Sequence, residues 1–427
     1  MLKNLGRWRP IIAGAFVLLA VACGSGDGES VTSTTDDELP GRGRLIATAS
    51  PLPVIDSPND IPEGLEAVWE TFAAIAREYV DRDTIDPEVL ARGAIRGMLN
   101  ALDDPYTAYV TPEGYKRQLE SFQGNFEGIG AQIDNTPDGR HIIVVAPIPD
   151  TPAERAGIKS GDIIIAVDGE DTEGWSVIDA VNRIRGEGGT PVELTIQRLG
   201  ELDPIVVTII RGTIPTASVF TRDLHDGDGN PEDPPYSVIR ITQFTERTAE
   251  ELREAIKEVK AANSEGIILD VRSNPGGLLE ATVDVASEFL DGGLVTYEIN
   301  GRGVRRDWPA RSGGSALDMP LVLLVNEFSA SGSEVLAAAL QDRGRAAVLG
   351  TKTFGKGSVN ILRDLKEDDG GIYLTIARWY TPNGDLIEGD GVQPDVTIEL
   401  PFDSEVDLQL EAAIEQLNFQ LSIAQVG

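Results

Sequence analysis

Residues 320–360 read PLVLLVNEFSASGSEVLAAALQDRGRAAVLGTKTFGKGSVN. The first six residues are apolar enough to form a buried strand, and the alanine-rich run at 334–341 is typical of a helix. Between them lies a turn of small residues with three serines, and a lysine stands between two glycines near the end. A strand that leads through such a turn into a helix indicates an α/β fold with functional groups at its strand ends.

The sequence around this stretch repeats the same alternation. Residues 236–244 and 266–271 are predicted strands, and 247–263 and 279–290 are predicted helices. We therefore expect a mixed α/β fold whose α/β core occupies residues 211–400. The amphipathic residues 401–427 are predicted to form a C-terminal helix that packs back on this core.

A shortage of histidine directs attention to a serine and a lysine. Only His141 and His225 are present, and neither lies in a motif that suggests catalysis. A serine hydrolase needs a base for the hydroxyl proton, and histidine is the usual one. If this chain cuts bonds with a serine, lysine is the expected base, which makes Ser331 and Lys356 the candidate pair.

Each candidate also has an ordinary structural interpretation. Ser331 and Glu334 have the spacing of a capping box, so the serine can simply cap the helix. To act as a base, Lys356 needs a pKa roughly three pH units below about 10.4, worth about 4 kcal/mol, which burial can supply. The ordinary alternative is a solvated surface lysine. A nucleotide-binding loop fits poorly, because Gly357 stands where Ser or Thr is needed and a strand-like segment follows.

A glycine turn at 270–279, DVRSNPGGLL, follows another predicted strand. Backbone N–H groups at such a turn can stabilise an oxyanion, which makes Gly276 and Gly277 candidate donors. The alternative is a strand-to-helix turn that merely needs glycine.

Residues 116–210 contain short β-runs, glycine-rich turns and one late helix, typical of a small β-rich domain. They resemble a PDZ domain in the loop at 128–131, the block AGIKSGDIIIAVDG at 156–169 and the helix at 176–185. A glycine-containing loop beside an exposed strand edge suits the binding of a peptide C-terminus. The candidate peptide-binding residues are Gly128, Ile129, Gly130, Ala131, Val177 and Val181; the alternative is that they are turn glycines and core aliphatics.

With this insertion, residues 64–400 resemble the carboxy-terminal processing peptidases, a family of tail-specific serine peptidases. The resemblance is carried by RITQF, LDVRSNPGGLL, LVNEFSASGSEVLAAALQDRGRAAVLG and KTFGKGSV. It implies Ser331 as nucleophile, Lys356 as base, and Gly332 with Gly276 and Gly277 as oxyanion donors. A glutamine usually completes the site four residues after the lysine. Asn360 stands there in this chain, and we expect it to serve although it is one methylene shorter.

The N-terminal residues indicate export. Residues 1–23 have a basic start, an apolar run and the only cysteine, Cys23, in AVAC, which resembles a bacterial lipoprotein signal except that Ala20 replaces the usual leucine. We expect an extracytoplasmic protein anchored to the bacterial cell membrane through a lipid on Cys23; a secreted protein is the alternative. Residues 24–62 are predicted to be a linker and 63–115 a helical region that caps the core or forms a dimerisation arm.

The predicted function is that of a serine endopeptidase that recognises proteins by accessible C-terminal tails and cleaves near them. A catalytically impaired PDZ adaptor that only binds tails is the alternative. The net charge of −34 argues against nucleic acid as a partner. No cofactor or metal is expected, and both a homo-oligomer and an activating adaptor are left open.

Overall fold

The computed structural model describes residues 64–136, 140–224, 234–365, 370–400 and 406–424. The predicted signal peptide, Cys23 and the predicted linker lie outside these ranges. The chain divides into two compact units, Met1–Ile75 and Ala76–Gly427. No helix in the described ranges is long and apolar enough to cross a membrane.

Helices dominate the start of the described chain. α1 (Leu65–Glu78) and α2 (Pro87–Asn100) lie in residues 63–115, which were predicted to be helical. The carboxylate of Asp86 caps α2 by accepting a hydrogen bond from the Glu88 N–H at 2.9 Å. α3 (Pro112–Gln123) was not predicted.

The β-rich domain has one antiparallel sheet in the order β3-β4-β5-β7-β8, with β6 paired to β5. Its strands are β3 (Ala131–Asn135), β4 (Ile142–Pro147), β5 (Ile163–Val167), β6 (Glu170–Asp171), β7 (Pro191–Gln197) and β8 (Ile205–Ile210). Its helices are α4 (Pro152–Arg155) and α5 (Val177–Ile184). β2 (Asn125–Gly128) and β9 (Gly212–Pro215) pair where the chain enters and leaves this domain. Because β3 is an edge strand, it can accept a further strand.

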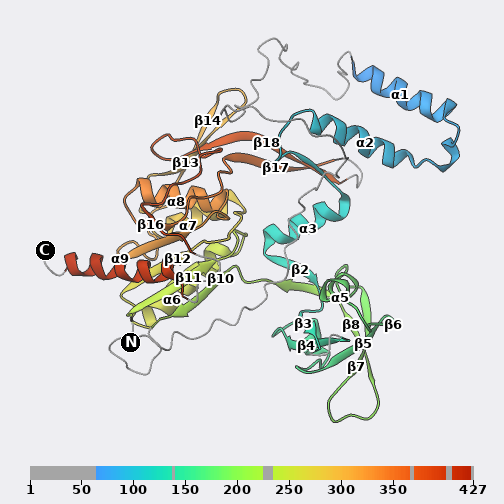
Figure 1. Cartoon of the computed structure of the whole chain (residues 1–427), viewed down its shortest axis with the longest axis horizontal. Helices are drawn as coiled ribbons and strands as arrows, with labels where there is room; N and C mark the ends of the chain where they lie inside the picture. Colours follow the sequence, from blue (N-terminus) through green and yellow to red (C-terminus); the bar gives the residue numbers. More distant parts are fainter. Residues whose placement is uncertain (1–63, 137–139, 225–233, 366–369, 401–405, 425–427) are drawn as a thin grey trace, which may run out of the picture. The chain divides into compact units, whose positions relative to one another are not determined.

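The core contains a six-stranded sheet in the order β10-β11-β12-β15-β16-β19, parallel except for the β10–β11 pair (Figure 1). Its strands are β10 (Val219–Asp223), β11 (Tyr236–Ile241), β12 (Gly266–Asp270), β15 (Leu321–Val325), β16 (Ala347–Gly350) and β19 (Val396–Thr397). Its helices are α6 (Thr248–Ala261), α7 (Leu279–Ser287), α8 (Gly332–Asp342) and α9 (Leu408–Ala424).

Successive side chains along these strands point to opposite faces of the sheet, and both faces are buried. Leu269 and Leu323 belong to the apolar cluster that includes α6, α7 and α8, whereas Ile268 and Leu324 belong to the cluster with α9. Every residue of β12 and β15 is buried, which explains why the sequence shows these strands as continuous apolar runs. The mixed α/β fold expected from the sequence is confirmed.

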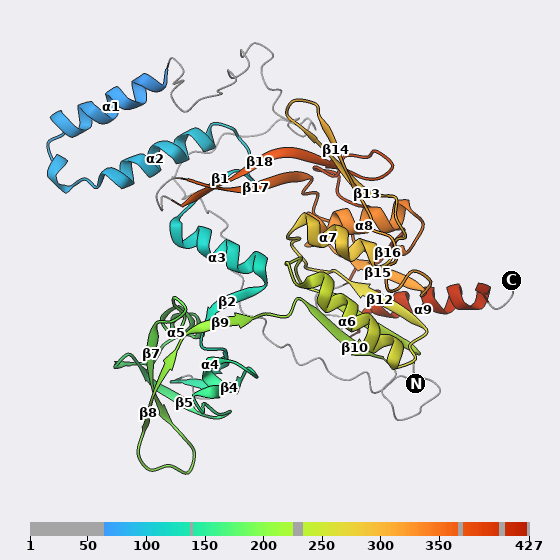
Figure 2. The ribbon, with the colours of Figure 1, turned by 180° about the vertical axis from the view of Figure 1, so that it is seen from behind.

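A second, antiparallel sheet lies on the other side of α7 and α8 (Figure 2). It consists of β1 (Ala108–Val110), β13 (Leu294–Asn300), β14 (Arg305–Pro309), β17 (Ser358–Asp364) and β18 (Gly371–Tyr380). Val295, Ala377 and Trp379 of this sheet belong to the same buried cluster as α8. Of these strands, only β17 was predicted, and β1 shows that the N-terminal region contributes to the core.

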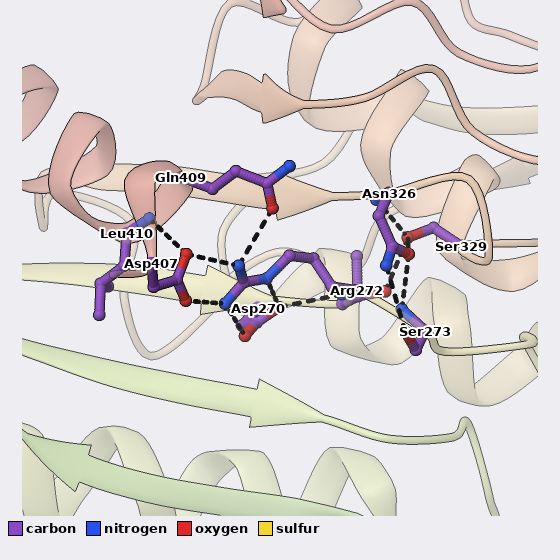
Figure 3. A network of polar contacts seen from close by, with 9 residues as sticks. Asp270, Arg272, Ser273, Asn326, Ser329, Asp407, Gln409 and Leu410 are labelled. Carbon is purple, nitrogen blue, oxygen red and sulfur yellow. Dashed lines mark hydrogen bonds and ion pairs between the residues drawn. The ribbon is translucent and has the colours of Figure 1, made fainter. Parts of the chain in front are cut away.

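A guanidinium ties the carboxyl end of β12 to the start of α9 (Figure 3). Arg272 donates to both carboxylate oxygens of Asp270, to both of Asp407, and to the Gln409 side chain, at 2.9–3.0 Å. The Arg272 side chain is only 16% exposed and that of Asp270 5%. Burial alone would lower the pKa of Arg272, but these two carboxylates raise it above its ordinary value. The C-terminal helix is therefore fixed to the strand end that leads into the glycine turn.

We expect Arg272→Leu to lower the free energy of unfolding by about 3 kcal/mol, because it leaves the buried Asp270 carboxylate unpaired. Urea denaturation measures this loss. Arg140→Leu is the matched control, since Arg140 pairs with Glu173 on the surface and the loss should stay within about 1 kcal/mol. Equal losses in the two variants would contradict the structural role of Arg272.

Candidate active site

Ser331 stands where the chain turns from β15 into α8. Its backbone has φ 54° and ψ −113°, an unfavourable conformation for a residue with a Cβ. The side chain is half-buried. Its N–H donates to Glu334 Oε2 at 2.7 Å, so the part of the predicted capping box in which the glutamate reaches back is formed. Strain of this kind is common at nucleophiles held at helix starts.

Glu334 also holds the loop that carries Lys356. The Lys356 N–H donates to Glu334 Oε2 at 2.9 Å, the same oxygen that accepts from Ser331. The Gly355 N–H and the Thr353 hydroxyl each donate to Glu334 Oε1 at 2.6 Å. Glu334 is fully buried. Burial raises its pKa above the ordinary value, although these four hydrogen bonds favour the ionised form.

The amine of Lys356 is largely withdrawn from water. Its Nζ lies 5.3 Å from the ring centroid of Tyr106 and 5.7 Å from that of Tyr373. Burial lowers the pKa of Lys356, and the charges of Glu388, Glu334 and Asp104 oppose this in part. The close backbone approach that the flanking glycines predict is present, since a Cβ on Gly357 would lie 2.1 Å from the Glu388 nitrogen. A lysine in such a place is suited to accept a proton.

The glycine turn packs directly against the serine turn. A Cβ on Gly276, which has φ 101°, would lie 2.8 Å from the Ser331 Cβ and 2.9 Å from the Gly332 nitrogen. The structure therefore brings Gly276 and Gly332 together with Ser331, while Gly277 forms a bridge with Phe244. The Gly276 N–H donates to Asn274 Oδ1 at 2.9 Å, so this donor is already engaged. The oxyanion roles of the three glycines stay predictions.

Hydrogen bonds to the Asn274 backbone carbonyl and to the Asn326 side chain hold the two turns together. The Asn274 carbonyl accepts from the Ala330 N–H at 3.0 Å and from the Ser333 hydroxyl at 2.9 Å. Asn326 Oδ1 accepts from the Ser273 N–H at 2.7 Å, in the network of Figure 3. The position of the glycine turn is thus fixed relative to Ser331.

Asn360 lies on β17 and faces the segment before β1. Its side-chain nitrogen donates to the Tyr106 carbonyl at 3.1 Å and to the Thr375 hydroxyl at 2.8 Å. Its side-chain oxygen accepts from the Ser358 hydroxyl at 3.1 Å. These bonds use both ends of the amide, and its predicted role as a third member of the site stays a prediction.

The predicted peptide-binding residues lie at the end of β2 and in the loop after it, on β3, and on α5, which contacts β3. Gly128, Ile129 and Gly130 are buried, and Ile129 belongs to the domain core. Ala131 at the start of β3 and Val177 and Val181 on α5 are partly exposed. Of the six predicted residues, these last three are therefore the ones that keep exposed surface.

The comparisons with known proteins agree with this architecture. Models for peptidase family S41, the PDZ domain and the N-terminal domain of the activating protease CtpB match residues 236–398, 143–198 and 48–114. The carboxy-terminal-processing protease of Bartonella bacilliformis is 38% identical over 367 residues, 84% of this chain and 80% of the relative. The chain belongs to the carboxy-terminal-processing proteases of family S41.

Two further relatives are similar to this chain over most of its length. The carboxy-terminal processing protease CtpA of Bacillus subtilis is 38% identical over 333 residues, 78% of this chain and 68% of that protein. A solved photosystem II D1 C-terminal processing protease is 30% identical, covers 83% of this chain and 97% of its own, and has a TM-score of 0.46. The family predicted from the sequence, with its inserted PDZ domain, is confirmed. Within the described ranges, no group of three or more His, Cys, Asp or Glu residues could hold a metal ion.

Sequence reasoning missed most of what surrounds Lys356. The capping-box pattern pointed to Glu334, but only as a helix cap, and nothing local indicated that its carboxylate also binds the lysine loop. Tyr106 and Tyr373 were missed because they come from the N-terminal region and from an unpredicted strand. The signal that could have identified Glu334 is an acidic residue in an otherwise apolar, buried helix.

We expect Glu334→Gln to reduce kcat/KM by about 100-fold, because the amide group would turn an N–H donor toward backbone donors and displace both loops. Initial rates on a peptide substrate measure this loss. Glu327→Gln is the control, since Glu327 is exposed and bonds only Thr351 among the contacts of the described chain. A wild-type rate for Glu334→Gln would show that the shared carboxylate does not position the pair.

Proposed function

We propose that this carboxy-terminal-processing protease is a serine endopeptidase in which Ser331 is the nucleophile and Lys356 the base. The observation that carries the proposal is the shared oxygen of Glu334, which accepts hydrogen bonds from the backbones of both residues. The lowered pKa of the buried Lys356 supports a neutral amine, and the strained backbone of Ser331 supports a nucleophile.

The proposed reaction has two stages. Lys356 Nζ accepts the Ser331 hydroxyl proton while Oγ attacks the peptide carbonyl, and the backbone N–H groups of Gly277 and Gly332 stabilise the oxyanion. The C–N bond then breaks, and Nζ returns the proton to the leaving amine, which gives an acyl-enzyme. Water next donates a proton to Nζ and attacks the ester, and the proton returns to Ser331 Oγ on release of the new carboxylate.

The PDZ domain is proposed to select substrates by their C-terminal tails. β3 is an edge strand, so a bound tail can pair with it by β-augmentation, with its carboxylate at the loop 128–131. Ala131, Val177 and Val181 would then contact the last side chains. The partners are proteins with accessible tails, and the match of residues 48–114 to the N-terminal domain of an activating protease supports a regulated enzyme.

We further propose that the enzyme acts outside the cytoplasm and is anchored through a lipid on Cys23. The basic residues, the apolar run and the single cysteine of the first 23 residues support this location. The predicted linker that follows would hold the enzyme away from the membrane surface.

For the proposed mechanism, we expect Ser331→Ala and Lys356→Ala in residues 24–427 to lower cleavage of an unstructured reporter at least about 1,000-fold. In the wild type, kcat/KM should fall as the pH falls through the pKa of Lys356, because the ammonium form cannot accept the serine proton. Rates measured from pH 5 to 9 check both expectations.

The same assay includes a reporter whose C-terminal carboxylate is amidated. We expect cleavage of the amidated reporter to be about tenfold weaker if tails are read by the PDZ domain. Undiminished cleavage by either variant would refute the Ser–Lys mechanism. Tail binding with no cleavage by any protein would instead favour the non-catalytic adaptor.

The anchor is tested with Cys23→Ser in the full chain. We expect the wild type to fractionate with membranes and to incorporate an alkyne fatty acid, and the variant to lose the label and leave the membrane fraction. Ser331→Ala is the control and should stay anchored. An unlabelled wild type in the culture medium would show a secreted protein instead.

A further inference from the structure

Two aromatic rings from separate parts of the chain lie near the Lys356 amine. Tyr373 is on β18, and Tyr106 lies in the turn just before β1. The distances from Nζ to the ring centroids, 5.3 and 5.7 Å, are within the range of cation–π contacts, about 6 Å. Both tyrosines are half-buried. Burial raises the pKa of each phenol, so both stay neutral and keep their ring faces available to the amine.

The turn that carries Tyr106 is fastened to the antiparallel sheet. β1 pairs with β18, with Ala108 opposite Tyr373, and the two strands lie side by side in Figure 2. The Thr107 hydroxyl donates to Asp104 at 2.7 Å and accepts from the Thr375 N–H at 3.1 Å. The register of the β1–β18 pair therefore fixes the turn that carries Tyr106 relative to Tyr373.

Asn360 adds the bond that reaches Tyr106 itself. Its side-chain nitrogen donates to the Tyr106 carbonyl at 3.1 Å, across 254 residues of sequence. The same nitrogen donates to Thr375 and the oxygen accepts from Ser358, so the amide is fixed in orientation. Asn360 thus holds the backbone from which the Tyr106 ring extends toward Lys356.

The charged groups around the amine come from three elements. They are Glu388 in the loop after β18, Glu334 on α8 and Asp104 in the turn before β1. All three favour the ammonium form of the lysine, whereas burial favours the neutral amine. The rings act in both directions, because they exclude water and also present their negative faces to a cation. The effect of removing a ring on the pKa of Lys356 therefore depends on whether water or an apolar side chain fills the space.

We propose that Tyr106 and Tyr373 are positioning residues that hold the Lys356 amine against their rings, and that Asn360 acts on this base through Tyr106. The inference rests on the proposed Ser–Lys reaction. The proposal gives the N-terminal region a direct part in the active site. Without the turn at 104–107, the Lys356 amine would lose its contact with the Tyr106 ring.

The test measures pH profiles of kcat/KM for wild type, Tyr106→Ala, Tyr106→Phe, Asn360→Ala and the double variant Tyr106→Ala/Asn360→Ala. Tyr106→Ala should lower kcat/KM at pH 7 at least about tenfold and move the acid limb to higher pH, because water then solvates the ammonium. Tyr106→Phe keeps the ring and should stay within about twofold of wild type. Asn360→Ala should shift the limb in the same direction by less.

The double variant shows whether Asn360 acts through Tyr106. If it does, adding Asn360→Ala to Tyr106→Ala should change kcat/KM by less than about twofold. Tyr109→Ala is the matched control: Tyr109 is on β1, its ring faces Arg96, and its loss should leave the profile unchanged. A full additional loss in the double variant would overturn the role given to Asn360.

Tyr106→Leu and Tyr373→Leu cover the case in which Tyr106→Ala fails to fold by circular dichroism. Leucine keeps water out but lacks the ring face, so the acid limb should move to lower pH, opposite to the alanine variant. Unchanged limbs in the leucine variants, or in a folded Tyr106→Ala, would overturn the proposal. Lys356→Ala is measured in the same assay. If it stays active, the Ser–Lys mechanism has failed. If it is inactive and the pH profile of Tyr106→Ala is unchanged, only the role of the aromatic rings is rejected.

Discussion

One buried carboxylate determines the arrangement of the site. Glu334 accepts from the backbones of Ser331, Gly355 and Lys356 and from the Thr353 hydroxyl. A carboxylate without partners is expensive to bury, so α8 can hold one only while both loops stay in place. The energetic demand of this single group therefore couples the serine turn to the lysine loop.

The rest of the structure supports this coupling from two sides. The parallel sheet brings the ends of β12 and β15 together, so that the glycine turn packs on Ser331 with no room for a Cβ at Gly276. The Arg272 network fixes the same strand end to the C-terminal helix. On the lysine side, β17 and β18 carry Asn360 and Tyr373, and β1 brings Tyr106 from the N-terminal region. The site thus depends on segments from every part of the core.

The sequence predicted the three central strands of the six-stranded sheet, β11, β12 and β15, but of the antiparallel sheet only β17. β12 and β15 are buried on both faces, and their apolar runs are visible without any knowledge of neighbours. β14 is mostly exposed and β18 only partly buried, so neither shows a clear period. α3 was missed because its sequence, PEGYKRQLESFQ, is mostly polar and has too few apolar residues to show a helical period.

The sequence by itself determined the family, the α/β alternation, the PDZ insertion and the candidates Ser331 and Lys356, because these depend on local patterns and spacing. Only the tertiary structure decided that Glu334 joins their loops and that Tyr106 and Tyr373 lie near the amine. Local patterns relate residues a few positions apart, whereas the bond from Asn360 to Tyr106 spans 254 positions and exists only once β1 has paired with β18. The pairing of distant strands is set by the packing of the whole core, which no short stretch of the sequence specifies.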